Sequence, residues 1–444
     1  MPNHTKARKD GLVLILFGSA MLTLLSCYLQ GTTVYPMVDF RMMYDPARCL
    51  IAHGDPYSES DVLRTYLADG GDRRSDTERA RQVVTRYVYL PTSFSFTALF
   101  ALLPWGPAHT LWTALTLLSL ILAALLVWER GAIHAPVISG LLIGFLVANS
   151  EVLVITGTVA GIAVSLCIVA VWCFLQEKFA TAGILCLAVS LAIKPQDAGL
   201  VWLYFLLAGG VYRKRALQTL LATVALSIPP LLWVWHTAPN WIPELQSNMA
   251  AFFAHGGINS PGTASSGAHG LAMLVSMQAV FSFFWDDPRI YNPLTYLVCA
   301  PLLLVWAIVT MRSRMTLPKA WLALAAISAL SMMPVYHRQY DTKLLLLTVP
   351  ACVLLMAEGG RIGKLALLVN AAAFLLTADL PWVIILSLIG NLHAAGTGFA
   401  KQISDGLEIL PTPLMLTLTA IFYLWVYVRR SFVDTLPRTG SSRI

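Results

Sequence analysis

Three groups of ionisable residues could carry chemistry, and the first is the aspartate in Val38-Asp39-Phe40. A carboxylate held between apolar neighbours can have a raised pKa and can act as a general base toward a hydroxyl. Asp39 is therefore the candidate base, about ten residues beyond the first apolar stretch. The structural alternative is that Asp39 caps a helix or pairs with Arg41 or Arg48.

The second group is Lys194-Pro195-Gln196-Asp197, which follows an apolar stretch that begins at Phe179 and carries no other charge. A lysine at the end of such a stretch can hold a phosphate as a point charge. The alternative is snorkelling, in which a helix-end lysine simply extends its ammonium group toward water. Lys194 is therefore a candidate phosphate ligand.

The third group is a dense polar run between two apolar stretches, Tyr336-His337-Arg338-Gln339-Tyr340-Asp341-Thr342-Lys343. His337 and Arg338 can bind a phosphate or stabilise a leaving group, and Asp341 can orient the imidazole ring. A loop that only has to turn does not require so many ionisable groups, although a solvated turn is the structural alternative. This run is the most specific polar cluster in the sequence.

The composition indicates a polytopic all-α membrane protein. Of the 444 residues, 57% are apolar and 12% are charged, whereas a soluble domain has about 25% charged residues. The mean hydropathy is +0.69, and the apolar residues occur in long runs. This excludes a cytosolic enzyme, a disordered chain and a nucleic-acid binder, so the net charge of +7 is expected to mark cytoplasmic loops. The seven cysteines show no disulfide framework and no metal-ligand spacing.

The hydropathy pattern predicts about twelve membrane spans, starting near residues 11, 107, 135, 152, 179, 198, 217, 293, 319, 343, 363 and 410. Leu90 to Leu103 is too short to cross and is expected to be interfacial or re-entrant, and Leu380 to Asn391 to be a peripheral helix on the outer side. If neither of these two segments crosses the membrane, the basic turns lie on the same side of the membrane as the basic N-terminus. The positive-inside rule then places both termini in the cytoplasm and the protein in the plasma (inner) membrane.

Two long loops, residues 30–92 and 236–292, then face the extracytoplasmic side together with the Lys194 and His337 turns. The first loop contains Asp39. The second joins aromatic segments through a Gly/Ser-rich stretch from Gly256 to Gly270. Aromatic segments of this kind lie at membrane interfaces, and a lid over a lipid-borne substrate is the alternative. The candidate catalytic residues are thus expected on one face of the membrane.

The chain resembles the GT-C glycosyltransferases of glycosyltransferase family 87, the polyprenyl-phosphate-mannose-dependent mannosyltransferase group, along nearly its full length. The matching motifs are, in chain order, Asp39, His53-Gly54-Asp55-Pro56-Tyr57, Tyr89-Leu90-Pro91 with Pro104, Thr156-Gly157-Thr158, Ala182-Gly183, Ala192-Ile193-Lys194-Pro195-Gln196 and the run from His337 to Asp341. The chain departs from the family at Gly157-Thr158, where Gly-Gln or Gly-Asn is frequent.

The resemblance implies one GT-C-like membrane domain over residues 1–444 and an inverting sugar transfer on the outer face. The donor would be a polyprenyl-phosphate sugar, with mannose as the expected sugar, and the acceptor a hydroxyl of a glycolipid, polysaccharide or protein. Asp39 would be the catalytic base, and Lys194 and His337 would contact the donor phosphate. The chemistry of its side chain suggests the same phosphate contact for Arg338. The supporting residues would be Asp341, Tyr340, Gln196, Tyr57 and Asp55.

We expect neither a cofactor nor a metal, because the first outer loop has no Asp-x-Asp pair and a lipid monophosphate needs less charge neutralisation than a diphosphate. One alternative function is a GT-C transferase that moves a pentose (arabinofuranose) or a glycan onto protein or polysaccharide. Another is a secondary transporter or lipid flippase. That function predicts ionisable residues near the middle of spans and an internal hydropathy repeat, and the sequence shows neither.

Overall fold

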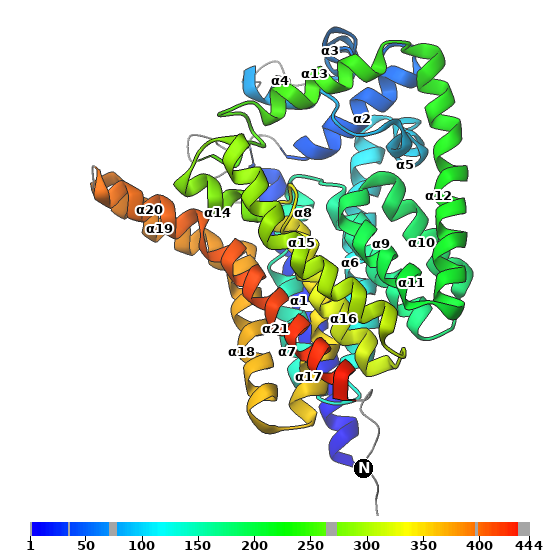
Figure 1. Cartoon of the computed structure of the whole chain (residues 1–444). Coiled ribbons are helices and arrows are strands. Elements are labelled where there is room, and N and C mark those ends of the chain that lie inside the picture. The colour runs from blue at the N-terminus through cyan, green and yellow to red at the C-terminus, as the bar shows by residue number, and fades with distance from the viewer. Residues whose placement is uncertain (1, 34–35, 71–77, 263–272, 396–397, 434–444) are drawn as a thin grey trace, which may run out of the picture.

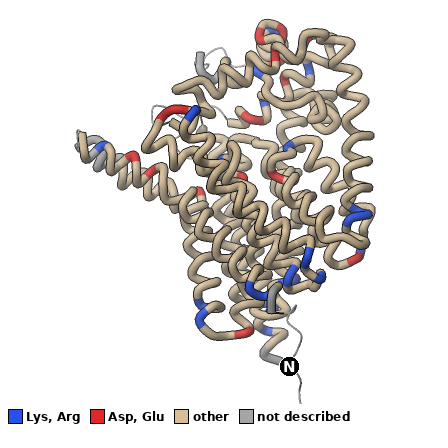
Figure 2. The backbone as a smooth tube through the Cα atoms, in the orientation of Figure 1, with Lys and Arg blue, Asp and Glu red and all other residues tan. Residues whose placement is uncertain are grey.

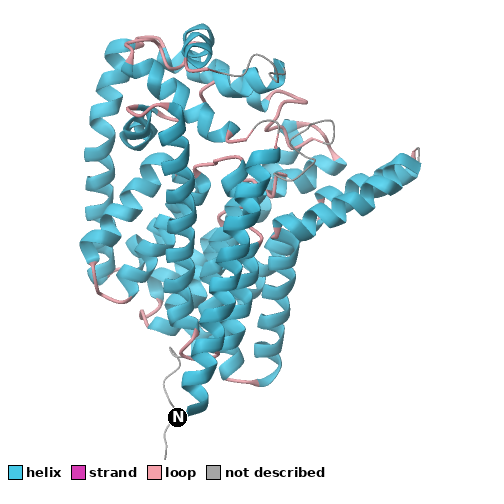
Figure 3. Ribbon diagram, turned by 180° about the vertical axis from the view of Figure 1, so that it is seen from behind, coloured by secondary structure: helices cyan, strands magenta, loops and turns pink. Residues whose placement is uncertain are grey.

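The computed structural model describes residues 2–33, 36–70, 78–262, 273–395 and 398–433, which form a bundle of helices. Figure 3 shows these helices joined by loops, and the described part of the chain contains no strand. An isolated bridge between Leu274 and Arg338 is its one β-type contact. The all-α fold expected from the sequence is confirmed.

The helices lie in chain order as follows: α1 (Pro2–Thr32), α2 (Val38–Ile51), α3 (Glu59–Ala68), α4 (Glu78–Thr85), η1 (Pro91–Ser93), α5 (Phe94–Ala101), α6 (Trp105–Gly131), α7 (Pro136–Ala148), α8 (Glu151–Ile155), α9 (Ala160–Leu175), α10 (Ala180–Ile193), α11 (Pro195–Ala208), α12 (Gly210–Thr237), α13 (Trp241–Phe253), α14 (Met277–Phe284), α15 (Pro288–Arg312), α16 (Leu317–Leu330), η2 (Gln339–Leu347), α17 (Thr348–Ala357), α18 (Gly360–Thr377), α19 (Asp379–Ala395), α20 (Phe399–Ile409) and α21 (Pro411–Val433). Within the described residues, eight helical segments are long and apolar enough to cross a membrane. Four shorter apolar helices accompany them. The protein is therefore a polytopic membrane protein, while the count of about twelve spans is not confirmed.

Proline explains why two helices in the middle of the bundle are short. Helices α10 and α11 have 14 residues each, which is about 21 Å of helix against a hydrocarbon core of about 30 Å. Pro195 begins α11, and a residue that precedes proline is disfavoured in the helical region. Lys194 accordingly has φ −149° and ψ 76° and separates the two helices. Lys194 at this break is buried, and α10 packs against the longer helix α12 (Figure 1).

The two ends of the bundle differ in structure and in charge. Helices α2, α3 and α13 lie across one end, which we call the cap, and the start of α1 lies at the other (Figure 1). Lysine and arginine gather around that other end, which we call the basic end (Figure 2). The N-terminus and the basic turns therefore share one end of the bundle, as expected from the sequence.

Two segments that were expected not to cross the membrane have short or peripheral structures. The stretch from Leu90 to Leu103 forms the three-residue η1 and the eight-residue α5, which together are too short to span a bilayer. The stretch from Leu380 to Asn391 lies in α19, which pairs with α20 in an arm that projects from the side of the bundle (Figure 1).

Close packing of glycines joins α1 to α7. A Cβ atom on Gly18 would lie 2.2 Å from the carbonyl oxygen of Gly144, and one on Gly140 would lie 2.4 Å from that of Gly11. Without a hydrophobic driving force between helices in lipid, such backbone contact between small residues is a main source of helix association. These glycines therefore fix the first helix against the rest of the bundle.

We predict that Gly18→Ala lowers stability by about 1–3 kcal/mol, because α1 and α7 must separate to admit the new methyl group. The measurement is thermal unfolding of the purified protein in detergent. Gly199→Ala in α11 is the matched control, since no atom lies within 4 Å of its added Cβ. It should be neutral or slightly stabilising, because alanine has the higher helix propensity. Equal effects of the two substitutions would contradict the packing argument.

Candidate active site

A cavity of about 740 Å³ lies beneath the cap, and six segments of the described chain supply its polar side chains. Its walls are largely apolar and include Val38, Leu90 and Phe252. Its ionisable residues include Asp39 from α2 and Arg338 from the turn before η2. Cavities of this size and mixed lining are typical of ligand sites.

Asp39 is held in place by the segment that follows α8. Its backbone N–H donates to the carbonyl oxygen of Thr156 at 2.9 Å, and the N–H of Met37 donates to that of Ile155 at 2.6 Å. Gly157 makes this approach possible, because it adopts φ +65° and a Cβ there would lie 2.8 Å from Met37 Sδ. Trp112 Nε1 donates to the carbonyl oxygen of Gly157 at 2.9 Å and secures the turn.

The surroundings of Asp39 suit a proton acceptor. Burial raises the pKa of its carboxyl group, while the positive charges of Arg338 and Lys194 and hydrogen bonds from the side chains of Thr156 and Thr158 lower it in part. The net shift is upward from the usual value. A carboxylate with a raised pKa accepts a proton more readily from a hydroxyl group.

Lys194 is buried and ion-paired at the break between α10 and α11. Its Nζ lies 3.2 Å from Asp197 Oδ2 and also contacts Asp341 Oδ1. Burial lowers the pKa of the ammonium group, but the two carboxylates outweigh this effect and the pKa is raised. Lys194 therefore stays charged, and its charge is compensated by its own neighbours. Its ammonium group also lies 5.2 Å from the ring centroid of Tyr340.

His337 lies behind the cavity wall, and its side chain is completely buried. Its Nε2 lies 3.4 Å from Asp197 Oδ1, and its Nδ1 lies 3.1 Å from the carbonyl oxygen of Val335. Burial lowers the pKa of the imidazole, but the hydrogen bond to Asp197 and the charge of Asp341 shift the pKa upward overall. His337 thus belongs to the same charge cluster as Lys194.

Asp197, His337 and Asp341 are the residue types that bind divalent metal ions, and one ligand atom of each lies within 4.8 Å of the others. The ammonium group of Lys194 contacts both carboxylates of this set. The positive charge of Lys194 therefore already compensates these two carboxylates.

Arg338 is positioned by contacts on both sides of its guanidinium group. Its Nε donates to Tyr336 Oη at 2.6 Å, and its Nη2 donates to the carbonyl oxygen of Ile258 at 2.7 Å and to Asn259 Oδ1 at 2.8 Å. Its backbone N–H donates to Asp341 Oδ2 at 2.8 Å. The charge cluster around Lys194 and the guanidinium group at the cavity are therefore linked through Asp341.

The structure brings together most of the site residues expected from the sequence. Five of them line the cavity: Asp39, Lys194, Gln196, Arg338 and Tyr340. His337 and Asp341 lie behind its wall. Tyr57 and Asp55 are not among the described lining residues: the hydroxyl group of Tyr57 donates to the carbonyl oxygen of Tyr89 at 2.9 Å, and Asp55 Oδ1 accepts from the N–H of Tyr57 at 2.9 Å. These two residues support the cavity wall from outside.

Other residues of the site were missed by sequence reasoning. The side chains of Thr156 and Thr158 hydrogen bond to Asp39. The sequence indicated only that these two residues belong to a motif similar to one of the family. Asn259 and Phe252 bring the second long loop into the cavity wall. The Gly/Ser-rich stretch from Gly256 to Gly270 falls partly outside the described residues. The signal available in the sequence was a glycine between two hydroxyl residues at the end of an apolar stretch.

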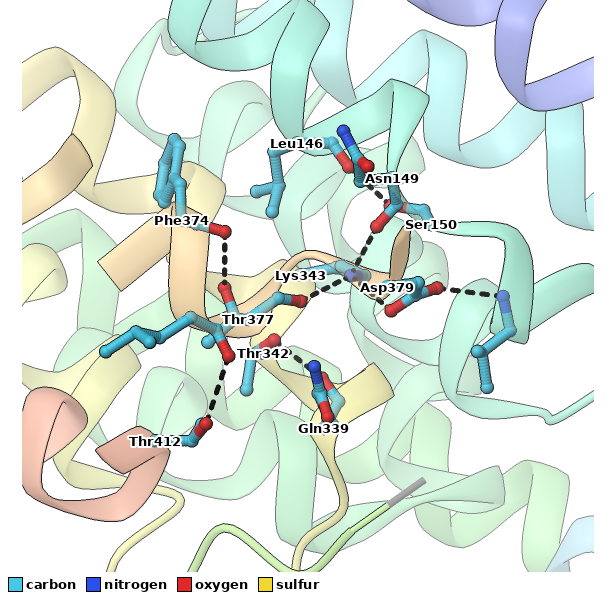
Figure 4. Close-up of polar contacts among 12 residues, drawn as sticks. Leu146, Asn149, Ser150, Gln339, Thr342, Lys343, Phe374, Thr377, Asp379 and Thr412 are labelled. Atoms are coloured by element: carbon cyan, nitrogen blue, oxygen red, sulfur yellow. Dashed lines mark hydrogen bonds and ion pairs between the residues drawn. The ribbon is translucent and has the colours of Figure 1, made fainter. Parts of the chain in front are cut away.

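A second buried ion pair secures the segments that carry these residues (Figure 4). Lys343 Nζ donates to the carbonyl oxygens of Asn149 at 2.9 Å and Thr377 at 3.0 Å and lies 3.2 Å from Asp379 Oδ1. The other oxygen of Asp379 accepts from the N–H of Val152 at 2.8 Å. This pair therefore joins the start of α8, the helix η2 and the break between α18 and α19.

Comparison with known proteins identifies one family. Residues 87–334, more than half of the chain, match the model of glycosyltransferase family 87. No curated protein and no solved structure matches the chain. The matched range contains Lys194 and the Thr156 to Thr158 segment, while Asp39 and Arg338 lie on either side of it.

We predict that Lys343→Met destabilises the protein by about 3–5 kcal/mol, because it leaves the buried carboxylate of Asp379 without its cation. The double variant Lys343→Met with Asp379→Leu should recover a large part of this loss. Thermal unfolding of the single and double variants measures the coupling. Arg64→Gln, which breaks the exposed pair with Asp61, is the control and should change stability by at most about 1 kcal/mol. A double variant no more stable than Lys343→Met would contradict the prediction.

Proposed function

The chain belongs to glycosyltransferase family 87, and we propose that it transfers a sugar, mannose first among the candidates, from a polyprenyl-phosphate donor to an acceptor hydroxyl. Asp39 is the proposed general base. The observation that carries the proposal is that the Asp39 carboxylate and the Arg338 guanidinium group line one largely apolar cavity. Such a cavity offers apolar surface to a lipid chain and opposite charges to the reacting groups.

The proposed reaction is a single displacement at the anomeric carbon. The acceptor oxygen forms the new bond to that carbon while the bond to the donor phosphate oxygen breaks, so the configuration of the sugar is inverted. The acceptor proton passes to Asp39, and the phosphate retains the electron pair of the broken bond. A cation fixed near that phosphate stabilises the charge that develops on it.

Arg338 is the cation best suited to contact the donor phosphate. Its guanidinium group lines the cavity and is fixed by Tyr336 and Asn259, and the planar fork of arginine matches phosphate geometry. Lys194 also lines the cavity, but two carboxylates already neutralise it. His337 is completely buried, so we propose a positioning role for it in place of the direct phosphate contact expected from the sequence.

The charge distribution supports an extracytoplasmic active site. Lysine and arginine gather at the end of the bundle opposite the cap (Figure 2), and the positive-inside rule associates such an end with the cytoplasm. We therefore propose a plasma-membrane protein with both termini in the cytoplasm and the cap outside. The acceptor would then be a glycolipid, a polysaccharide or a protein on the extracytoplasmic side.

We predict that Asp39→Asn lowers the rate of sugar transfer by about 10²–10⁴-fold, because the amide cannot accept the acceptor proton. The assay follows radiolabel from polyprenyl-phosphate-mannose to a lipid extract of the host with purified protein in nanodiscs. Asp10→Asn, at the exposed far end of α1, is the control and should retain activity. Full activity of Asp39→Asn would exclude the proposed base. Transfer from a pentose donor but not from the mannose donor would reassign the sugar.

We predict that Arg338→Gln moves the acidic limb of the pH profile of kcat/KM to higher pH. The base must be deprotonated to act, so activity is lost as the pH falls through the pKa of Asp39. The charge of Arg338 lowers that raised pKa, and its removal raises the pKa further. Arg338→Lys keeps the charge and should shift the limb less, while both variants should raise the KM for the donor. A shift to lower pH would contradict the assignment of Asp39.

A further inference from the structure

The polar side chains that line the cavity beneath the cap differ in whether the protein itself already occupies them. Thr92 Oγ1 donates to the carbonyl oxygen of Ala192 at 2.7 Å. Tyr336 Oη and Asn259 Oδ1 both accept from the guanidinium group of Arg338. Side chains of this kind are committed to the structure of the cavity wall.

The side chains of Tyr89 and Gln196 also line the cavity, but they have no hydrogen-bond partner in the part of the chain that the structure describes. Both are only partly buried. The cavity walls are largely apolar, and a polar group in such surroundings costs free energy unless a ligand or water bonds to it. These two side chains are therefore available to a bound ligand.

The main chain around Tyr89 is anchored, so its side chain starts from a fixed point. The carbonyl oxygen of Tyr89 accepts from Tyr57 Oη at 2.9 Å, and that of Tyr87 accepts from Asn248 Nδ2 at 3.2 Å. Burial raises the pKa of the Tyr89 hydroxyl group, and the negative charge of Asp39 raises it further. Tyr89 thus keeps its proton and offers a hydrogen-bond donor near the proposed base.

Gln196 lies in the first turn of α11, on the segment next to that of Tyr89. Thr92, three residues after Tyr89, bonds to the main chain of Ala192, and Gln196 follows four residues after Ala192. A glutamine amide offers both donors and an acceptor. Tyr89 and Gln196 together therefore suit ligand groups that both donate and accept, as hydroxyl groups do.

Charge distinguishes which part of the proposed donor suits these two side chains. A phosphate group placed against Tyr89 would be repelled by the carboxylate of Asp39, whose charge acts on that hydroxyl group. The guanidinium group of Arg338 offers a phosphate a better place in the same cavity. A neutral sugar carries no such penalty, so its hydroxyl groups are the better partners for Tyr89 and Gln196.

We infer that the side chains of Tyr89 and Gln196 hydrogen bond to hydroxyl groups of the donor sugar and make the cavity selective for the sugar-bearing lipid. The inference rests on the proposed function, since it places the sugar of a polyprenyl-phosphate donor in this cavity. A site built to bond to a substrate hydroxyl rejects an analogue that lacks it, because the polar groups of the site are then left unpaired. Polyprenyl phosphate without a sugar is such an analogue.

The experiment measures dissociation constants by native mass spectrometry on the purified full chain, without acceptor, for polyprenyl-phosphate-mannose and for polyprenyl phosphate. Tyr89→Phe should weaken binding of the mannosylated lipid about three- to tenfold, the effect of one lost neutral hydrogen bond. It should leave binding of polyprenyl phosphate unchanged. Gln196→Leu should show the same difference between the two lipids. Because the Tyr89 hydroxyl group has no partner among the described residues, its removal should leave the fold intact.

The matched control is Tyr296→Phe, which removes a hydroxyl group from a tyrosine of α15 that is 50% exposed and is not among the described residues of the cavity lining. It should change the binding of neither lipid. Equal weakening of both lipids by Tyr89→Phe would overturn the inference, because the hydroxyl group would then contact the phosphate or support the fold. Unchanged binding of both lipids would overturn it too. If the unsubstituted protein bound neither lipid, the proposed function itself would be overturned, and the inference with it.

Discussion

The need to compensate a positive charge inside a helical membrane bundle organises the candidate site. Pro195 ends one short helix and begins another, and Lys194 at this break is buried. An isolated ammonium group in such a place is very costly, and carboxylates at contact distance make it tolerable. Asp197 comes from the next helix and Asp341 from a segment far along the chain. One compensated lysine therefore holds two distant parts of the chain together.

The charge cluster around Lys194 also helps to position residues of the cavity, through the second carboxylate oxygen of Asp341. That oxygen accepts from the backbone N–H of Arg338, whose guanidinium group lines the cavity. Two residues beyond Asp341, Lys343 pairs with Asp379, which also accepts from the first turn of α8. The segment after α8 in turn binds the backbone of Asp39. Rigid networks of this kind keep reacting groups in a fixed geometry, which is the main contribution that a protein makes to group transfer.

The sequence predicted the residues of this site better than the contacts between them. Hydropathy identified the helices, and polar residues at their ends identified Asp39, Lys194 and Arg338, because charges that interrupt apolar runs are conspicuous. The same reasoning could not distinguish a charge that faces the cavity from one that is already paired. His337 was expected to contact a phosphate, but it is fully buried beside Asp197. The span count is not confirmed because proline breaks such as Lys194-Pro195 produce helices shorter than a bilayer, which a hydropathy window does not separate.

The two ends of the bundle use the same residue types under opposite physical conditions. At the cap end, Lys194 is buried and compensated by carboxylates, so salt in solution screens its interactions only weakly. At the basic end, Arg429, Arg361 and Lys364 are exposed, so their interactions with a membrane surface are screened within about 8 Å at physiological ionic strength. Lys319 is the exception there, since its side chain is buried. Burial, rather than residue type, therefore separates charges that organise a site from charges that only orient the protein in its membrane.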